Sequence, residues 1–355
     1  MANTFWRALI LSIALGLMAC DGEEGDPVDA FAAVDAAARA AFEAQGISGM
    51  GLAVYRQNGT KAFEKMYGDF SPDQRVAIAS ASKLVSGVTL FRLIDQGYLS
   101  LDSTTGETLG WTGESAQITL RQLLSFTSGL PPENRCTYQA TVTLAECVDL
   151  IRESTLVAPP GTRFDYGSTH LAVAGRMAEV VTGQSWSSLF ADELRGPLGL
   201  PTDIVYFANP LRSTGPDNPL LAGGLRVSMN EYERVLHLVF DKGMWNGAPL
   251  ISAQLFDTQA KTPYPDAVIG KSPARNAPDT RYGLTAWLEC STPATGCTTI
   301  SSPGVFGFTP WVDRDAGYYA ILGMEVIRNP STSNNFAVAL EHQLQPLIVQ
   351  ALSAH

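Results

Sequence analysis

The chain is short of basic residues and of histidine, and these shortages argue against two broad classes of function. Its 355 residues include 24 lysines and arginines against 35 aspartates and glutamates, so the formal net charge is −11, and no basic run occurs. An acidic chain of this kind is a poor candidate for binding nucleic acid. The histidines, His170, His237, His342 and His355, are scattered without the spacing of metal ligands, so we predict no metal site.

Other familiar signatures are also absent. No Gly-x-Ser-x-Gly motif occurs, so the chain lacks the strand-to-helix elbow that presents the serine of many hydrolases. No internal repeat appears, and no linker separates two independent units. The apolar content of 45% is ordinary for a globular protein with a full core. We therefore expect one large domain or two intimately joined ones.

The chain begins with the pattern of an export signal. The apolar stretch over residues 8–19 is too short to span a bilayer as a mature helix, and it ends in Leu17-Met18-Ala19-Cys20, which resembles a bacterial lipoprotein signal. We expect residues 1–20 to be a lipoprotein signal peptide, Cys20 to carry the lipid, and residues 21–27 to be a flexible tether. The protein would then lie at the periplasmic side of a bacterial membrane, inner or outer. An ordinary secretory peptide with a chance cysteine is the alternative.

The remaining cysteines fit an exported protein. They are Cys136, Cys147, Cys290 and Cys297, and they allow three pairings. The short pairs, Cys136–Cys147 and Cys290–Cys297, would close small surface loops, each stabilising the fold by about 2–3 kcal/mol. An oxidising compartment permits both disulfides, whereas a reduced protein would keep four free thiols.

Both ends of the chain show clear strand and helix patterns. Residues 28–45 are alanine-rich with apolar residues at helical spacing. Residues 49–55 and 61–67 read as strands around Asn58-Gly59, a strong hairpin signal. At the other end, strands are expected over residues 282–289, 298–308 and 318–326 and a closing helix over 334–353.

The middle of the chain reads as helical. Residues 118–128 favour a helix that stops at Gly129. Capping boxes open two further helices, Thr143 with Glu146 and Ser228 with Glu231, and Ser168 or Thr169 can cap a helix that runs to Thr182 and closes at Gly183. The prediction is an α+β fold. An antiparallel sheet built from both chain ends (about residues 28–75 and 280–355) is covered by the terminal helices and carries an inserted, mostly helical part (about residues 76–279).

The chemistry is concentrated at Ser80 and Lys83. Three positions apart on a helix, their side chains share one face, so an amine lies beside a hydroxyl. A serine needs such a base to become a nucleophile. Taken alone the pair has a plainer interpretation, in which Ser80 caps the helix and Lys83 points into solvent.

Several further motifs follow in order along the chain. With them, the chain resembles the superfamily of serine β-lactamases, penicillin-binding proteins and β-lactamase-type esterases, and is most similar to its class C and esterase branch. The segments that carry the resemblance are Ile78-Ala79-Ser80-Ala81-Ser82-Lys83, Ile118 to Pro131, Pro160-Gly161-Thr162-Arg163-Phe164-Asp165-Tyr166-Gly167-Ser168, Ala222-Gly223-Gly224-Leu225 and Arg281-Tyr282-Gly283-Leu284.

The resemblance implies roles for individual residues. Ser80 would be the acylated nucleophile, with Lys83 and Tyr166 transferring protons, and Tyr166 would be favoured as a phenolate beside Lys83. Which of the two is the base stays open. The oxyanion hole would consist of the backbone N–H groups of Ser80 and Val305, each such donor being worth about 3 kcal/mol to a transition state.

Two departures from the family pattern concern substrate binding. Ser168 stands where asparagine is usual, so a hydrogen bond to Lys83 or a substrate amide would be weaker; alternatively Ser168 only caps the next helix. Ser302-Pro303-Gly304 stands where Lys-Thr-Gly or His-x-Gly is usual, so Ser302 supplies no charge for a substrate carboxylate. Arg281 or Arg314 could replace that cation. Phe306, Phe308 and Trp311 would suit an apolar substrate group, or they belong to the core.

The sequence thus favours an exported serine hydrolase without a cofactor, and among these an esterase acting on small molecules. Ser168, Ser302 and Gly304 are its expected substrate-binding residues. An amidase or D,D-peptidase acting on D-amino peptides, or a weak β-lactamase, is the alternative, and a non-catalytic envelope-binding lipoprotein is the third. His170 could line the cleft, although a place on a helix surface is the more common situation for such a histidine.

Overall fold

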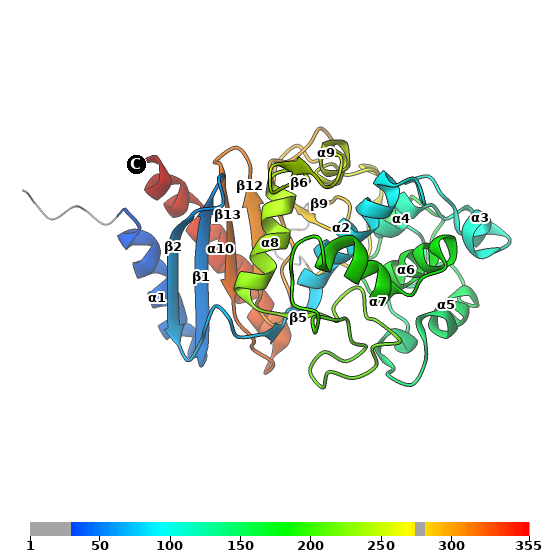
Figure 1. The fold of residues 1–355 in the computed structure, drawn as a ribbon, viewed down its shortest axis with the longest axis horizontal. Helices are drawn as coiled ribbons and strands as arrows, with labels where there is room; N and C mark the ends of the chain where they lie inside the picture. Colours follow the sequence, from blue (N-terminus) through cyan, green and yellow to red (C-terminus); the bar gives the residue numbers. More distant parts are fainter. Residues whose placement is uncertain (1–29, 274–280, 355) are drawn as a thin grey trace, which may run out of the picture.

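The structure is a computed structural model that describes residues 30–273 and 281–354, and it is built around one antiparallel sheet (Figure 1). The strand order is β2-β1-β13-β12-β11-β10-β9. The strands are β1 (Gly49–Arg56), β2 (Lys61–Gly68), β9 (Arg281–Tyr282), β10 (Trp287–Leu288), β11 (Thr299–Ser301), β12 (Thr309–Asp313) and β13 (Tyr318–Gly323). Because β1 pairs with β13, the sheet joins the two ends of the chain, and the predicted α+β class is confirmed.

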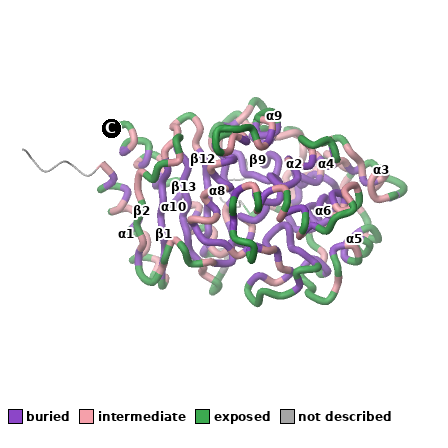
Figure 2. The backbone as a smooth tube through the Cα atoms, viewed as in Figure 1, coloured by how far each residue is buried: buried purple, intermediate pink, exposed green. Residues whose placement is uncertain are grey.

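Helices cover both faces of this sheet. On one face lie α1 (Ala32–Gln45) and α10 (Pro330–Ser353), and on the other lies α8 (Met229–Phe240), next to the helical region (Figure 1). Side chains of β1 alternate between the two cores, since Leu52 packs with the terminal helices and Ala53 with the helical region. Burial on both faces explains the nearly unbroken apolar run of β1, and Figure 2 shows the central strands buried along their length.

The inserted region consists mostly of short elements packed around the helix α2 (Ser82–Asp95). This helix is buried over most of its length and packs against α6 (Thr169–Thr182) and α7 (Trp186–Phe190). The elements of this region are β3 (Val76–Ala77), α2 (Ser82–Asp95), α3 (Thr105–Leu109), α4 (Leu120–Leu124), α5 (Leu144–Arg152), β4 (Arg163–Phe164), α6 (Thr169–Thr182), α7 (Trp186–Phe190), β5 (Arg226–Val227), β6 (Met244–Trp245), β7 (Ala248–Pro249), α9 (Ala253–Gln259) and β8 (Val268–Ile269).

Local sequence signals are well realised. Thr143 and Glu146 form the predicted capping box of α5, with the Glu146 N–H donating to Thr143 Oγ1 over 3.2 Å and the Thr143 N–H donating to Glu146 Oε2 over 2.8 Å. Ser228 and Glu231 do the same for α8. Gly59 takes a φ of 79° in the hairpin turn, a conformation that suits glycine.

Three predicted elements differ from the structure. The helix expected over residues 118–128 is reduced to α4, because the chain leaves the helix and reaches a φ of 59° at Phe126. The strand expected over residues 282–289 is two strands, β9 and β10, separated by a turn in which Thr285 has a φ of 60°. The strand expected over 298–308 ends at Ser301, since Pro303 lacks an N–H group for the ladder, and β12 then follows as an unpredicted strand.

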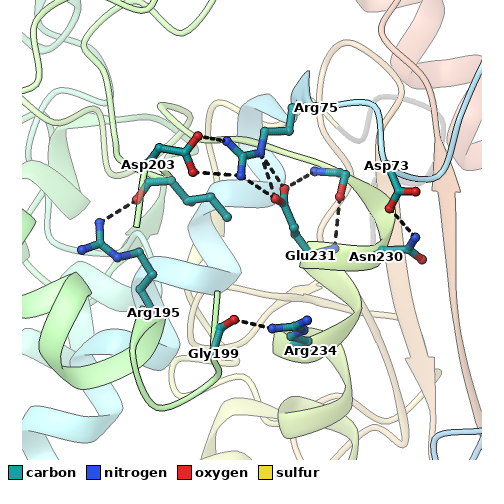
Figure 3. A network of polar contacts seen from close by, with 10 residues as sticks. Asp73, Arg75, Arg195, Gly199, Asp203, Asn230, Glu231 and Arg234 are labelled. Carbon is teal, nitrogen blue, oxygen red and sulfur yellow. Dashed lines mark hydrogen bonds and ion pairs between the residues drawn. The ribbon is translucent and has the colours of Figure 1, made fainter. Parts of the chain in front are cut away.

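A polar clamp fixes the chain that leads to Ser80. Arg75, directly before β3, donates from Nη2 to Glu231 Oε1 of α8 over 2.6 Å and from Nη1 to Asp203 Oδ2 over 2.6 Å (Figure 3). The same loop is held by Arg195, whose Nη1 donates to the carbonyl of Ile204 over 3.0 Å. Arg75 therefore ties β3 to one helix and one loop before the chain turns into Ser80.

Candidate active site

Ser80 lies in a tight turn that is fixed from two sides. It occupies a single 3₁₀ turn, Ala79–Ala81, that ends directly before α2 begins at Ser82. Ala79 has a φ of 45°, a left-handed conformation that costs a non-glycine residue about 1 kcal/mol and is common at functional sites. On the far side Gly304 packs so closely that a Cβ there would lie 2.2 Å from the Ile78 carbonyl oxygen. Packing therefore holds the turn in a conformation that the chain would not adopt alone.

Lys83 is the immediate neighbour of the Ser80 hydroxyl. Its Nζ lies 3.0 Å from Ser80 Oγ and donates to the carbonyl of Ala222 over 2.7 Å, and the residue is only 4% exposed. Burial lowers the pKa of the Lys83 amine to about 7; Glu133 opposes this effect and Lys271 adds to it. A substantial fraction of Lys83 is therefore neutral near pH 7 and able to accept a proton from Ser80.

Tyr166 forms an aromatic wall of the same site. Its ring stacks on Trp287 at 5.3 Å and meets Phe126 edge-on at 5.4 Å, while Lys83 Nζ lies 4.7 Å from its ring centroid. Burial raises the pKa of the Tyr166 phenol well above its usual range, more than the neighbouring Ser80 hydroxyl lowers it. The expectation of a phenolate is therefore wrong, because Lys83 faces the ring of Tyr166 and is itself partly neutral.

Backbone donors for an oxyanion are provided by the segments around Ser80 and Val305. Within the described chain, neither the Ser80 N–H nor the Val305 N–H donates to a protein carbonyl. The turn that carries Val305 is held by the Gly304 N–H, which donates to the Phe308 carbonyl over 2.7 Å. Ser302 Oγ donates to the Ser80 carbonyl over 3.3 Å, which joins the two segments. The structure thus brings together Ser80, Lys83, Tyr166, Ser302 and the segment 304–305.

Ser168 has a different role from either expectation. It occupies the N-cap position of α6 without capping the helix through its side chain, and it is buried. Its Oγ donates to the Glu133 carboxylate and lies 3.2 Å from Tyr138 Oη. No hydrogen bond joins Ser168 to Lys83 in the described residues. Ser168 therefore orients Glu133.

Glu133 is the residue near the site that sequence reasoning missed. Its carboxylate accepts from Tyr138 Oη over 2.8 Å and pairs with Lys271 Nζ at 3.2 Å. It acts on both proton-transfer residues, since its charge favours protonation of Lys83 and disfavours ionisation of Tyr166. The signal available in the sequence was its place directly after Pro131-Pro132, at the end of the segment Ile118 to Pro131 that carries part of the family resemblance.

Neither arginine considered as a replacement cation reaches Ser80. Arg314 is fixed at the end of α8, where Nη2 donates to the Val239 carbonyl over 2.7 Å, and burial lowers the pKa of its guanidinium to about 10. Arg281 lines a small cavity with Ser125 and Thr127 behind the aromatic wall. Among the residues that the structure describes, neither arginine therefore replaces the expected cation, whereas Lys271, paired with Glu133, acts on Lys83.

Other predicted site residues belong to the core. Phe308 is fully buried against Tyr232, and Trp311 is fully buried on the face under α10, so only Phe306 of the three aromatic residues is partly exposed. His170 neither lines the cleft nor lies on a helix surface. It is fully buried, with Nε2–H donating to the Asp165 carbonyl over 2.7 Å and Nδ1 accepting from Ser128 Oγ over 2.8 Å. Burial lowers its pKa to about 4 and keeps the ring neutral.

Both predicted disulfides are present. Cys136–Cys147 and Cys290–Cys297 have Cα–Cα distances of 5.2 and 5.5 Å. Cys20, the signal peptide over residues 1–20 and the tether over 21–27 lie outside the described residues. Within the described residues, no helix combines the length and apolar character that crossing a membrane requires.

Comparison with known proteins agrees with this geometry. The family described as Beta-lactamase matches residues 34–325. Penicillin-binding protein 4 of Amycolatopsis lactamdurans is 35% identical over 139 residues, which is 38% of this chain and 36% of that protein. The chain thus spans roughly a third or less of the length of the curated relatives that it matches.

Solved structures resemble the chain over nearly its whole length. A Bacteroides dorei DSM 17855 protein assigned to the β-lactamases has a TM-score of 0.78 at 28% identity, covering 91% of this chain and 99% of that one. EstCE1, a hydrolase with promiscuous acyltransferase activity, has a TM-score of 0.69 at 18% identity, covering 92% and 98%, and shows the shared fold alone. The family match covers most of this chain's length, so the chain belongs to the Beta-lactamase family.

Proposed function

We propose that the protein hydrolyses esters through an acyl-enzyme on Ser80. The observation that carries this proposal is the position of Ser302. Its hydroxyl bonds to the Ser80 carbonyl where relatives would offer a cation to a substrate carboxylate. An uncharged, partly apolar acyl group suits such a site better than an anionic peptide or a penicillin. The hydrolase EstCE1, which has the same fold, supports the assignment by analogy.

Lys83 is the base in the proposed first step. The neutral amine accepts the Ser80 hydroxyl proton across 3.0 Å while Oγ attacks the ester carbonyl, and the N–H groups of Ser80 and Val305 bind the oxyanion. The C–O bond to the alcohol then breaks, and the departing oxygen takes a proton. The protonated Tyr166 is suited to donate it, because burial keeps the phenol neutral.

Deacylation returns the site to its starting state. A water molecule gives a proton to the Tyr166 oxygen, which lost its own to the alcohol, and attacks the acyl carbon. Ser80 Oγ then leaves as the hydroxyl by taking back the proton held on Lys83. The hydrogen bond from Lys83 to the Ala222 carbonyl keeps the amine aimed at Oγ throughout. The edge of Tyr166, stacked on Trp287, offers an apolar wall to the acyl or alcohol group.

Hydrolysis of a short-chain p-nitrophenyl ester by residues 21–355 tests the proposal. We expect turnover that vanishes in Ser80→Ala and an intact-mass increase of one acyl group on Ser80 in the wild type. Ser82→Ala is the matched control, because Ser82 follows Ser80 by two residues and its Oγ accepts a hydrogen bond from the Leu225 N–H. Equal rates in wild type and Ser80→Ala would remove the esterase assignment. Absence of turnover on any ester, amide or penicillin would favour a non-catalytic envelope-binding protein.

A second candidate, amide or weak penicillin hydrolysis, has one observation in its favour. Lys271 lies close enough to lower the pKa of Lys83, so a cation from another segment stands near the site. The curated relative named as a penicillin-binding protein adds support. Intact-mass measurement after incubation with benzylpenicillin separates the candidates. A Ser80 adduct that forms in wild type and not in Lys271→Gln would favour the second.

Export and lipid attachment remain part of the proposal. The two disulfides support an oxidising compartment. We expect the full chain to incorporate labelled palmitate in a bacterial host and to fractionate with membranes. A Cys20→Ser variant that still takes up the label would contradict lipid attachment at Cys20.

A further inference from the structure

A second group of ionisable side chains lies away from Ser80, where α10 meets the edge of the sheet. Glu289 directly follows β10, and Glu341 and His342 are neighbours on α10. One ligand atom from each of the three lies within 4.8 Å of the others. Residues far apart in the sequence are thus brought together in a place that the reaction at Ser80 does not use.

Glu341 is the unusual member of this group. It is fully buried, and neither of its carboxylate oxygens accepts a hydrogen bond from the described chain. The polar group that faces it is the Glu289 carboxylate, to which Glu341 can donate only when it is protonated. Nor does a lysine or arginine of the described residues pair with Glu341 or Glu289. A buried carboxylate without a partner is strongly unfavourable, so either a proton or a cation must neutralise it.

Glu289, in contrast, is held firmly in place. Its Oε1 accepts from Ser301 Oγ and its Oε2 accepts from Gln345 Nε2 over 2.9 Å. Gln345 lies one turn beyond Glu341 on α10, so helix and strand both orient this carboxylate. Metal-binding carboxylates are usually oriented by such secondary hydrogen bonds.

His342 completes the group and provides access. Its Nε2 lies 3.7 Å from Glu289 Oε2, and its side chain is 54% exposed. An ion can therefore enter from the His342 side, while Glu341 closes the inner side.

We infer that Glu289, Glu341 and His342 form a binding site for one divalent transition-metal ion, with Zn²⁺ as the best match. Two carboxylates and a neutral imidazole give a charge of −2, which one such ion neutralises. Zinc accepts mixed oxygen and nitrogen ligands and commonly binds three protein groups and one water, whereas Mg²⁺ and Ca²⁺ prefer oxygen alone. The prediction of no metal site, made from histidine spacing, could not include ligands that are mainly carboxylates.

The site would act on the structure and not on the reaction. Ser301, which binds Glu289, pairs with Trp311 on the face covered by α10, whereas the next residue, Ser302, reaches the Ser80 carbonyl. A bound ion would fasten α10 to the same chain segment that leads to the oxyanion turn.

Zinc titration of the tag-free chain over residues 21–355, stripped with a chelator, tests this inference. We expect one Zn²⁺ per chain by calorimetry and a rise in Tm of about 4 °C at a hundredfold excess over Kd. Glu341→Gln and His342→Ala should each weaken binding by at least about tenfold. Because His342 is exposed, its variant tests the site even if Glu341→Gln folds poorly.

His237→Ala is the matched control, since His237 and Glu233 form a partly buried histidine–carboxylate pair on α8 with 3.9 Å between Nδ1 and Oε1. Its zinc affinity should equal that of the wild type. Zinc binding that survives in both Glu341→Gln and His342→Ala overturns the inference, and so does a wild-type chain that shows no zinc binding by calorimetry.

Discussion

Two buried ionisable residues, Lys83 and Glu341, lie on different sides of the sheet and have opposite surroundings. Lys83 is 4% exposed and has two partners, Ser80 Oγ and the Ala222 carbonyl. Glu341 is 0% exposed and accepts no hydrogen bond from the described chain. Burial outweighs the nearby Glu133 charge and turns Lys83 into a usable base, whereas the same burial leaves Glu341 dependent on a proton or a metal ion. Burial alone therefore does not define a function; the partners do.

Replacing Lys83 tests this contrast with the largest expected effect. Lys83→Met removes the base, and Lys83→Arg keeps a cation that does not lose its proton. We expect each to reduce kcat/KM on a p-nitrophenyl ester by about 10³-fold or more. Initial rates of p-nitrophenyl ester hydrolysis across pH 6–9 measure this loss of kcat/KM. If Lys83→Arg kept near wild-type activity, Lys83 would not be the base.

Replacing Tyr166 tests the second proton-transfer residue with a smaller expected effect. Tyr166→Phe keeps the ring on Trp287 and removes only the hydroxyl, so we expect kcat to fall by about 10²-fold with Tm nearly unchanged. The pH at which the rate reaches half its maximum should stay near 7, because the pKa of Lys83 sets it. A shift of that midpoint to alkaline pH in wild type, lost in Tyr166→Phe, would make Tyr166 the base.

Measurements of the free energy of unfolding test both buried residues, Lys83 and Glu341. In the presence of a chelator, Lys83→Met and Glu341→Met should each raise the free energy of unfolding by about 1–4 kcal/mol, since each removes a poorly neutralised buried group.

The stability should also depend on pH through Lys83. Its folded pKa of about 7 lies below the ordinary value of 10.5, so the unfolded chain binds more protons between these values. Wild-type stability should therefore rise from pH 7 to pH 10.5, and Lys83→Met should lose this slope. Urea denaturation at several pH values measures both effects, and a variant less stable than wild type would contradict the argument.

The smallest expected effect comes from the charges around Lys83. Glu133 raises the pKa of Lys83 and Lys271 lowers it. The midpoint of the acid side of the pH–rate profile should therefore move to lower pH in Glu133→Gln and to higher pH in Lys271→Gln. Arg152→Gln, an exposed change near neither residue in the described contacts, is the control. Movement of both midpoints in the same direction would show that loop structure, and not charge, sets the profile.

The sequence predicted the parts of the fold that depend on neighbouring residues. The hairpin at Asn58-Gly59, the capping boxes at Thr143 and Ser228, and both disulfides connect residues close in sequence, so their signals are local. Ser80 and Lys83 share a helical turn for the same reason. The division of residues 282–289 into two strands was missed because Thr285 adopts a φ of 60° that its side chain does not announce.

The parts of the site that were missed depend on distant contacts. Ser168 meets Glu133 only because the loop before α5 folds against α6, so a comparison with the family motif assigned it to Lys83 or to a helix cap. His170 could not be placed in the core without knowing that Phe126 would stack on it at 5.0 Å. The pairing of Glu289 with Glu341 likewise requires α10 to pack across the sheet edge.

The pairing of β1 with β13 also dictates when the enzyme can become complete during synthesis. Ser80, Lys83 and the Ala222 carbonyl belong to the first two thirds of the chain, whereas Val305 and β13 come near its end. β1 lacks its second neighbour until residues 318–323 have left the ribosome, and such distant pairings form slowly. The proposed nucleophile and base are thus made well before the proposed oxyanion donor, so a nascent or C-terminally truncated chain cannot assemble the full proposed site.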